Sequence, residues 1–381
     1  MEVSCDHDRR AYHRNKGASL KILITGNMGY VGGAVVRNLR HRHPGATIIG
    51  YDSAFFAHCL TTRHEVPERL LDRQMFGDVR AMRAGELEGY DAVILLAAVS
   101  NDPMGERFSR VTSEINQDAC VRIAHAASAA GVGNLVFASS CSVYGVAQGG
   151  PRRETDPLNP MTAYAASKVN TERALQEVGG DMTITSLRFA TACGMSDRLR
   201  LDLVLNDFVA SALVSRRIDV LSDGTPWRPL IDTADMARAI QWAATRSQDN
   251  GGRNLVVNAG ANAANYQVHQ LAETVAASVP GCRVSVNREA PADSRSYRVD
   301  FSRFAELAPG HLPQTSLTAS VHDLVTGLRN LGFCNTDFRN SPLVRLQVLK
   351  QLIAEGRLSE DLSWTQAMRR GVVAQREEVQ A

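Results

Sequence analysis

The sequence predicts an α/β protein with a doubly wound parallel sheet, a smaller mixed α/β domain and a helical C-terminal tail. In the first half of the chain, short apolar runs alternate with segments whose apolar residues recur at helical spacing. Such alternation implies parallel strands with helices on both faces of the sheet. The pattern becomes less regular after the strand expected at 183–188, so we expect part of the second domain to begin there.

The predicted elements follow in order. A strand at 21–25 runs into a glycine turn and a helix whose apolar face includes Val35 and Leu39. Further strands are expected at 46–50, 91–97, 134–138 and 183–188, with a helix from about 118 to 130. A helix at 232–245 and a strand at 254–258 are expected to return to the first domain, and the helix, strand and helix of the smaller domain are expected at 267–279, 283–286 and 316–331.

These elements define the predicted domains. The first spans 19–190 and is completed by about 225–260, and the second combines 191–224 with 261–335. Leucines from Leu343 to Leu352 recur every three to four residues, which predicts an amphipathic helical extension over 336–381. Residues 1–18 are expected to be disordered.

Composition restricts the classes of function. The chain has 381 residues, 44 % of them hydrophobic, and a formal net charge of +2. Because acidic and basic residues are interspersed, nucleic-acid binding is not expected. The seven cysteines show no CxxC or zinc-ligand spacing, so we expect reduced thiols and no metal site. The longest apolar run, 92–99, is too short to span a bilayer and no signal peptide is recognisable, so a cytoplasmic protein is expected.

A glycine turn joins the first predicted strand to the first predicted helix. Gly26, Gly29 and Gly32 form a GxxGxxG pattern. Small residues there allow a tight turn and let backbone N–H groups approach a diphosphate at the helix N-terminus. The residues expected to contact a dinucleotide are Gly26, Asn27, Met28, Gly29, Tyr30, Val31 and Gly32.

Two acidic residues follow the next two expected strands. Asp52 ends the second strand about twenty residues after the turn, where a carboxylate accepts hydrogen bonds from the adenosine ribose and repels a 2′-phosphate. This favours NAD over NADP. Asp78 and Val79 follow the third strand position and are expected to face adenine.

Three polar residues indicate proton and hydride transfer. Tyr164 and Lys168 are four apart and therefore share one helix face. An ammonium beside a phenol is expected to lower the phenol pKa and make Tyr164 a usable base. Ser140, in the Ser139-Ser140-Cys141-Ser142-Val143-Tyr144-Gly145 segment, is expected to hold the substrate hydroxyl.

With these motifs in this order, the segment from about Leu20 to Leu331 resembles the extended short-chain dehydrogenase/reductase family, in particular its NAD-dependent nucleotide-sugar epimerases and dehydratases. The resemblance implies a Rossmann-like domain that binds NAD and a smaller C-terminal domain that binds a nucleotide sugar. Chemistry is expected in the cleft between them. The family also implies a homodimer.

The resemblance assigns roles to individual residues. Ser140 is the catalytic hydroxyl, Tyr164 the base, and Lys168 binds the nicotinamide ribose. Asn116 matches an asparagine that steadies the active-site helix. Leu96, Ala97 and Ala98 match the strand end beside NAD. Arg228 is the expected anchor of the substrate diphosphate, and the other expected substrate contacts are Ser100, Ser142, Thr191, Asn206 and Arg295.

One departure from the family restricts the chemistry. Sugar 4,6-dehydratases typically carry acidic residues directly after the catalytic hydroxyl, where this chain has Cys141 and Ser142. Dehydration and decarboxylation are therefore less favoured, and Cys141 is expected to be a packing residue. The leading hypothesis is a redox-neutral nucleotide-sugar 4-epimerase. A net NAD-dependent oxidoreductase and a non-catalytic NAD-responsive binding protein are the alternatives.

Overall fold

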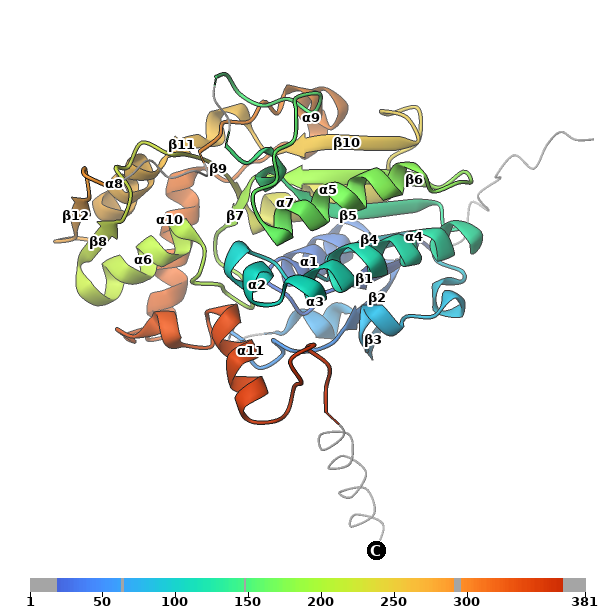
Figure 1. Ribbon diagram of the computed structural model, residues 1–381, viewed down its shortest axis with the longest axis horizontal. Helices are drawn as coiled ribbons and strands as arrows, with labels where there is room; N and C mark the ends of the chain where they lie inside the picture. Colours follow the sequence, from blue (N-terminus) through green and yellow to red (C-terminus); the bar gives the residue numbers. More distant parts are fainter. Residues whose placement is uncertain (1–18, 63–64, 147–148, 291–295, 366–381) are drawn as a thin grey trace, which may run out of the picture.

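A seven-stranded sheet forms the centre of the fold. The computed structural model describes residues 19–62, 65–146, 149–290 and 296–365. All neighbouring strands of the sheet are parallel, in the order β10-β6-β5-β4-β1-β2-β3 (Figure 1). Their bounds are β1 (Lys21–Thr25), β2 (Thr47–Asp52), β3 (Arg73–Phe76), β4 (Ala92–Leu95), β5 (Asn134–Ser140), β6 (Thr183–Phe189) and β10 (Asn254–Ala259). The predicted α/β class with a doubly wound parallel sheet is confirmed.

Helices cover both faces of this sheet. In Figure 1, α4 (Cys120–Ala129) and α5 (Ala163–Gln176) lie in front of it, and α1 (Gly32–Arg42) and α7 (Thr233–Thr245) lie behind it. The buried side chains of α1 and α7 belong to one apolar cluster, whereas those of α4 belong to another. Strands enclosed on both sides explain why β1, β4 and β6 are almost entirely apolar or buried.

The strand order reverses between β1 and β4, which are neighbours in the sheet. From β1 the chain proceeds to β2 and β3 on one side, and from β4 to β5 and β6 on the other. Crevices at such a reversal, outside the carboxyl ends of the strands, are where open α/β sheets bind ligands. The glycine turn after β1 lies at this point.

A second region contains two small sheets. One has the order β11-β9-β7 and the other pairs β12 with β8. Helices α6 (Val204–Ser215), α8 (Val268–Ser278) and α10 (Leu317–Asn330) share an apolar cluster with residues of both sheets. Strand β9 pairs with β7 and β11, although its residues fall in the segment expected to complete the first domain. The strands are β7 (Thr191–Cys193), β8 (Arg217–Val220), β9 (Trp227–Asp232), β11 (Asn265–Gln267) and β12 (Arg283–Val286), and the remaining short helices are α2 (Asp102–Arg107), α3 (Ser109–Ser113) and α9 (Ser302–Leu307).

The C-terminal extension is less helical than the sequence predicted. Its only α-helix within the described residues is α11 (Arg345–Ala354), and residues 355–365 form turns with a β-bridge between Leu358 and Trp364. Gly356, at a φ of 69°, follows the helix and allows the chain to reverse there. Residues 1–18 and 366–381, expected to be disordered and helical respectively, lie outside the described residues.

A buried ion pair joins three elements beneath the predicted catalytic residues. Arg188 on β6 contacts Glu172 on α5 at 2.7 Å, and only 4 % and 3 % of these residues are exposed. Glu172 also accepts a hydrogen bond from Ser139 of β5 at 2.5 Å. Since Ser140 follows Ser139, and since α5 carries Tyr164 and Lys168, this pair fixes the strand and helix that bear the predicted catalytic residues.

Candidate active site

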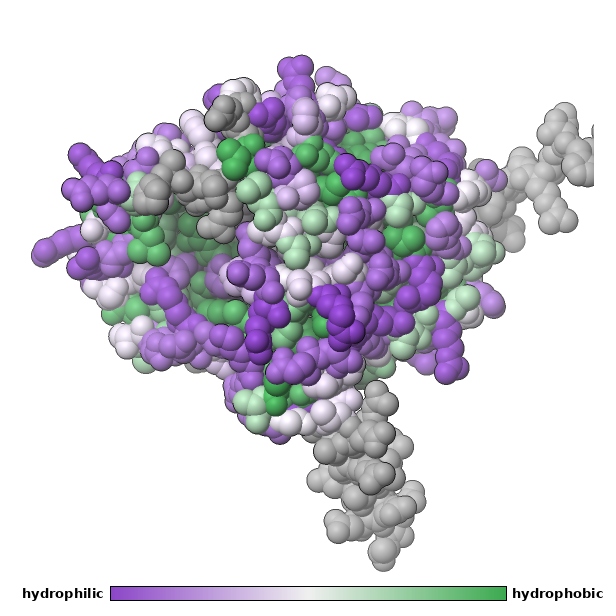
Figure 2. All heavy atoms as spheres, in the orientation of Figure 1, coloured by the Kyte–Doolittle hydropathy of each residue, from purple (hydrophilic) through white to green (hydrophobic). Residues whose placement is uncertain are grey.

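One cavity of about 990 Å³ lies at the point of strand reversal and extends to the second region. Figure 2 shows the hollow in this face of the molecule, with hydrophobic residues on its inner wall and hydrophilic residues around its rim. The predicted cofactor residues that line it are Gly26, Gly29, Tyr30, Val31, Gly32, Asp52, Asp78, Val79, Leu96, Ala97, Ala98, Tyr164 and Lys168. The structure therefore brings together residues from five separate segments of the sequence.

The glycine turn fits a dinucleotide diphosphate. A Cβ on Gly26, whose φ is 77°, would lie 2.5 Å from the Ala97 backbone nitrogen, and one on Gly32 would lie 2.1 Å from the Asn27 carbonyl oxygen. Only glycine is compatible with these approaches. The bare backbone before α1 leaves its first N–H groups accessible to an anion. Asn27 and Met28, also expected to contact the cofactor, do not line the cavity and instead stabilise the turn.

Asp52 is held between the turn and the end of β2. Its carboxylate accepts hydrogen bonds from the backbone nitrogens of Met28 at 3.0 Å and Ala54 at 2.7 Å. Burial raises the pKa of Asp52, and these two hydrogen bonds act in the opposite direction. The carboxylate thus has a fixed orientation at the edge of the cavity, where it fits the predicted ribose contact.

Replacing Asp52 by asparagine is expected to weaken NAD binding by about tenfold or more, because a charged hydrogen-bond acceptor is lost. Binding of NADP should weaken less, since the repulsion of its 2′-phosphate is also removed. Titration calorimetry with both dinucleotides measures the ratio of the two dissociation constants. An unchanged ratio would contradict the ribose role.

Asn116 connects the loop after β4 to α5. Its side chain exchanges hydrogen bonds with the backbone of Val99, at 2.9 and 3.0 Å, and donates to the Ser167 hydroxyl at 3.2 Å. Asn116 is completely buried and lies in a π-helical turn over 114–119. This geometry supports the predicted role of Asn116 in steadying the active-site helix.

Ser140, Tyr164 and Lys168 meet at one wall of the cavity. Ser140 ends β5, and its hydroxyl is within hydrogen-bonding reach of Tyr164 in the first turn of α5. The Lys168 ammonium donates to the Ala138 carbonyl at 2.8 Å and lies 5.5 Å from the centre of the Tyr164 ring. A hydroxyl, a phenol and an ammonium therefore converge, which is what transfer of a proton from a carbinol requires.

The expected lowering of the Tyr164 pKa is wrong. Burial raises the pKa of Tyr164 to about 12, although Ser140 and the nearby charge of Arg200 act in the opposite direction. Burial also lowers the pKa of Lys168 to about 8. The sequence showed the spacing of the two residues on a helix, but the depth at which the helix buries them depends on the tertiary fold.

The predicted substrate residues occupy different environments. Ser100, Ser142, Thr191 and Arg228 line the cavity, and the buried Ser142 hydroxyl has no hydrogen-bond partner within the described part of the chain. Asn206 does not line it, because its amide is engaged with Gly194, Tyr30 and Arg200. Arg295 lies outside the described residues.

Cys141 has the packing environment that the sequence predicted. Its side chain is completely buried in the core and its thiol donates to the Arg188 carbonyl at 3.1 Å. Burial raises the pKa of the thiol. Cys141 therefore lies outside the cavity lining and is unsuited to acid–base work there.

Sequence reasoning missed two charged residues at the catalytic wall. Asp102 lines the cavity, accepts a hydrogen bond from Thr162 at 2.8 Å and opposes ionisation of Tyr164. Arg200 forms an ion pair with Asp202 at 2.7 Å and donates to the Ser100 hydroxyl at 2.8 Å. Asp102 begins the short helix α2 and Arg200 lies in the loop before α6. Neither belongs to a recognisable motif, so a single sequence contains no signal for them.

The described residues contain no cluster of three or more His, Cys, Asp or Glu side chains suited to hold a metal ion. Within the same ranges, no helix has the length and apolar character needed to cross a membrane.

The chain is similar to known proteins of one family. The model of the NAD dependent epimerase/dehydratase family matches residues 22–260. The UDP-glucose 4-epimerase of Azospirillum brasilense is 27 % identical, over 64 % of this chain and 73 % of that protein. The dTDP-glucose 4,6-dehydratase of Streptomyces griseus is 25 % identical, over 74 % of this chain and 86 % of that protein. Among solved structures, MoeE5 in complex with UDP-glucose and NAD is 25 % identical, with a TM-score of 0.66 over 81 % of this chain and 99 % of MoeE5.

Proposed function

The chain belongs to the NAD-dependent epimerase/dehydratase family and its cofactor is NAD, and on this basis we propose that it is a nucleotide-sugar 4-epimerase. One observation supports this reaction above others. Ser140, Tyr164 and Lys168 converge on the cavity, while the two positions after Ser140 carry a buried thiol and a hydroxyl in place of acids. Such a site suits oxidation and reduction at one carbinol more than elimination of water.

In the proposed reaction, the Ser140 hydroxyl orients the 4-hydroxyl group of the sugar and Tyr164 removes its proton. When bound, NAD would supply the acceptor for a hydride from C4 and, as NADH, the donor for its return. Tyr164, protonated after the first half-reaction, gives its proton back to the 4-keto oxygen in the second. Between the two half-reactions the keto sugar rotates in the cavity and presents its other face to the cofactor. The product therefore differs from the substrate only in the configuration at C4.

Two cavity residues are suited to hold the diphosphate and the sugar of the substrate. Arg228 lies on β9 at the cavity wall, and its guanidinium can bind a diphosphate in a bidentate manner. Ser142 offers an unpartnered hydroxyl for a sugar oxygen, within the part of the chain that the structure describes. The volume of about 990 Å³ is at the upper end for ligand cavities, consistent with a site for two nucleotides.

Incubation with UDP-, dTDP-, GDP-, CDP- and ADP-sugars, followed by NMR of the products, tests the proposal. We expect one of these sugars to be converted into a mixture with its C4 epimer, while the absorbance of NADH stays constant. Accumulation of NADH would indicate a net oxidoreductase instead. A 4-keto-6-deoxy product would indicate a dehydratase, and the Asp102 carboxylate at the catalytic wall would then be a candidate acid or base.

A further inference from the structure

The C-terminal extension forms part of the wall of the central cavity. Arg345 and Leu349 of α11, and Leu362 beyond it, line the same cavity as the glycine turn and Asp52. The buried residues of α11 and Leu362 share an apolar cluster with Phe55, which follows β2. The extension is therefore packed into the fold beside the cofactor site.

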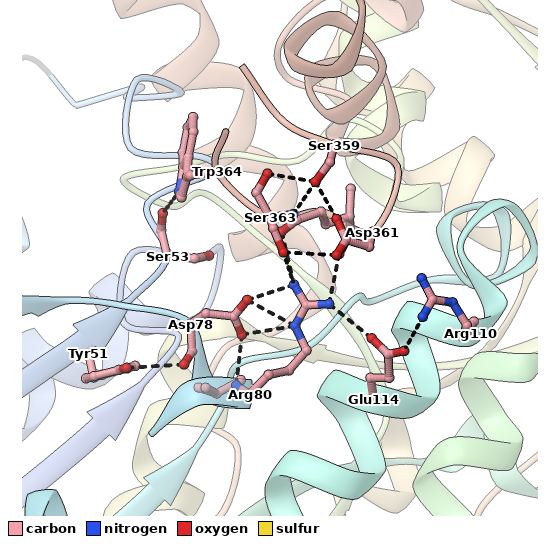
Figure 3. A network of polar contacts seen from close by, with 12 residues as sticks. Tyr51, Ser53, Asp78, Arg80, Arg110, Glu114, Ser359, Asp361, Ser363 and Trp364 are labelled. Carbon is pink, nitrogen blue, oxygen red and sulfur yellow. Dashed lines mark hydrogen bonds and ion pairs between the residues drawn. The ribbon is translucent and has the colours of Figure 1, made fainter. Parts of the chain in front are cut away.

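A polar network fastens this extension beside the expected adenosine end of the site (Figure 3). Arg80 pairs with Asp78 at 2.7 Å and donates to the carbonyl oxygens of Asp361 at 2.8 Å and Leu362 at 3.2 Å. The Trp364 indole donates to the carbonyl of Ser53, directly after Asp52, at 2.7 Å. Both loops that receive these contacts follow strands of the central sheet, so the position of α11 relative to the cavity is fixed.

Arg345 is a buried cation without a carboxylate partner. Only 2 % of this residue is exposed, and its guanidinium donates to the Arg198 carbonyl at 2.6 Å and the Pro342 carbonyl at 3.3 Å. No carboxylate of the described residues lies within ion-pairing distance of it. By contrast, two neighbouring arginines are neutralised, Arg198 by Glu68 and Arg200 by Asp202, each at 2.7 Å.

The centre of the Phe56 ring lies 4.9 Å from the Arg345 guanidinium, but an aromatic face and two carbonyls do not neutralise its charge. A buried charge without a counter-ion is strongly unfavourable, so it calls for an anion. Burial lowers the pKa of Arg345 to about 10, which still leaves the guanidinium charged at neutral pH. Arg345 lies next to the segment that packs on the N-terminus of α1. It donates to the carbonyl of Arg198, and a Cβ on Gly33, in the first turn of α1, would lie 2.7 Å from the carboxylate of the adjacent Asp197. The anion that this part of the cavity is built to receive is the diphosphate at the N-terminus of α1.

We propose that Arg345 binds the diphosphate of NAD, with Arg200 beside it, so that the C-terminal extension is an integral part of the cofactor site. The glycine turn supplies backbone N–H donors, and the extension supplies the compensating positive charge. This assignment concerns cofactor binding and does not depend on the proposed epimerisation.

Titration calorimetry on the full chain with NAD, ADP-ribose and adenosine tests the assignment. Arg345→Gln keeps a donor for the Arg198 carbonyl but removes the charge. We expect it to weaken binding of NAD and ADP-ribose by about ten- to a hundredfold and to leave adenosine binding unchanged. Arg345→Lys, which restores the charge, should recover part of the loss. Lys350→Gln removes the same charge from the exposed face of α11 and should change none of the three.

Three results would overturn the proposal. Unchanged NAD binding in Arg345→Gln would show that Arg345 does not contact the dinucleotide. An equal loss for adenosine would show that it only supports the local structure. In a parallel titration with UDP-glucose, weaker binding of that ligand with unchanged NAD binding would assign the anion to the sugar nucleotide. Should Arg345→Gln fail to fold, Arg345→Lys tests the proposal instead. Lysine cannot make the bidentate contact, so NAD binding must weaken more than adenosine binding, and equal effects on the two ligands would contradict the proposal.

Discussion

Replacing Tyr164 by phenylalanine is expected to reduce turnover by about a hundredfold to ten-thousandfold, the range over which a positioned acid–base group acts. The substitution removes only the phenol oxygen, and the aromatic ring that packs beneath the Lys168 ammonium stays in place. Binding of NAD is therefore expected to change little. Turnover follows from product formation measured by NMR, and NAD affinity from calorimetric titration.

The matched control for Tyr164→Phe is Tyr90→Phe. Tyr90 precedes β4 and does not line the cavity, so loss of its hydroxyl should leave turnover unchanged. If Tyr164→Phe retains full turnover, Tyr164 is not the base, and the proposed reaction loses its proton acceptor. A loss of NAD binding equal to the loss of turnover would assign Tyr164 to cofactor binding instead.

Removing the Glu172 carboxylate is expected to lower the free energy of unfolding by about 3–5 kcal/mol, the range for breaking a buried ion pair. Glu172→Ala leaves the Arg188 guanidinium buried without a counter-charge and deprives the Ser139 hydroxyl of its acceptor. Urea unfolding followed by circular dichroism measures the change. Turnover should also fall, because the pair orders the end of β5 next to Ser140.

Glu177→Ala is the matched control for this stability effect. Glu177 follows α5 and is exposed, so its removal should change the free energy of unfolding by no more than about 0.5 kcal/mol. Equal losses in the two variants would mean that the Arg188–Glu172 pair contributes nothing beyond an ordinary surface charge.

Several elements of both regions could be predicted from local pattern. The expected strand at 21–25 coincides with β1, and the strand at 283–286 with β12. The helix expected at 267–279 is α8 (Val268–Ser278). Each of these segments has a hydrophobic period that matches its own secondary structure, so local and tertiary preferences agree.

The tail shows where local pattern was insufficient. Leucines from Leu343 to Leu352 keep a helical period, and α11 forms there. Beyond Gly356 the described chain bends back toward β2 because Trp364 and Leu362 find partners on the central fold. Those partners are about 300 residues away in the sequence, and no local periodicity encodes them.

The residues of the candidate site likewise fall into those that local pattern predicted and those that depend on the tertiary fold. The sequence by itself determined the glycine turn, Asp52 and the Ser140, Tyr164 and Lys168 set, because each depends on a residue type at a fixed spacing within one strand–turn–helix unit. Only the tertiary structure decided that Asn206 turns away from the cavity, that burial raises the Tyr164 pKa, and that Arg345 enters the cavity wall. These outcomes depend on burial and on charges brought together from distant segments, and both quantities exist only in the folded chain.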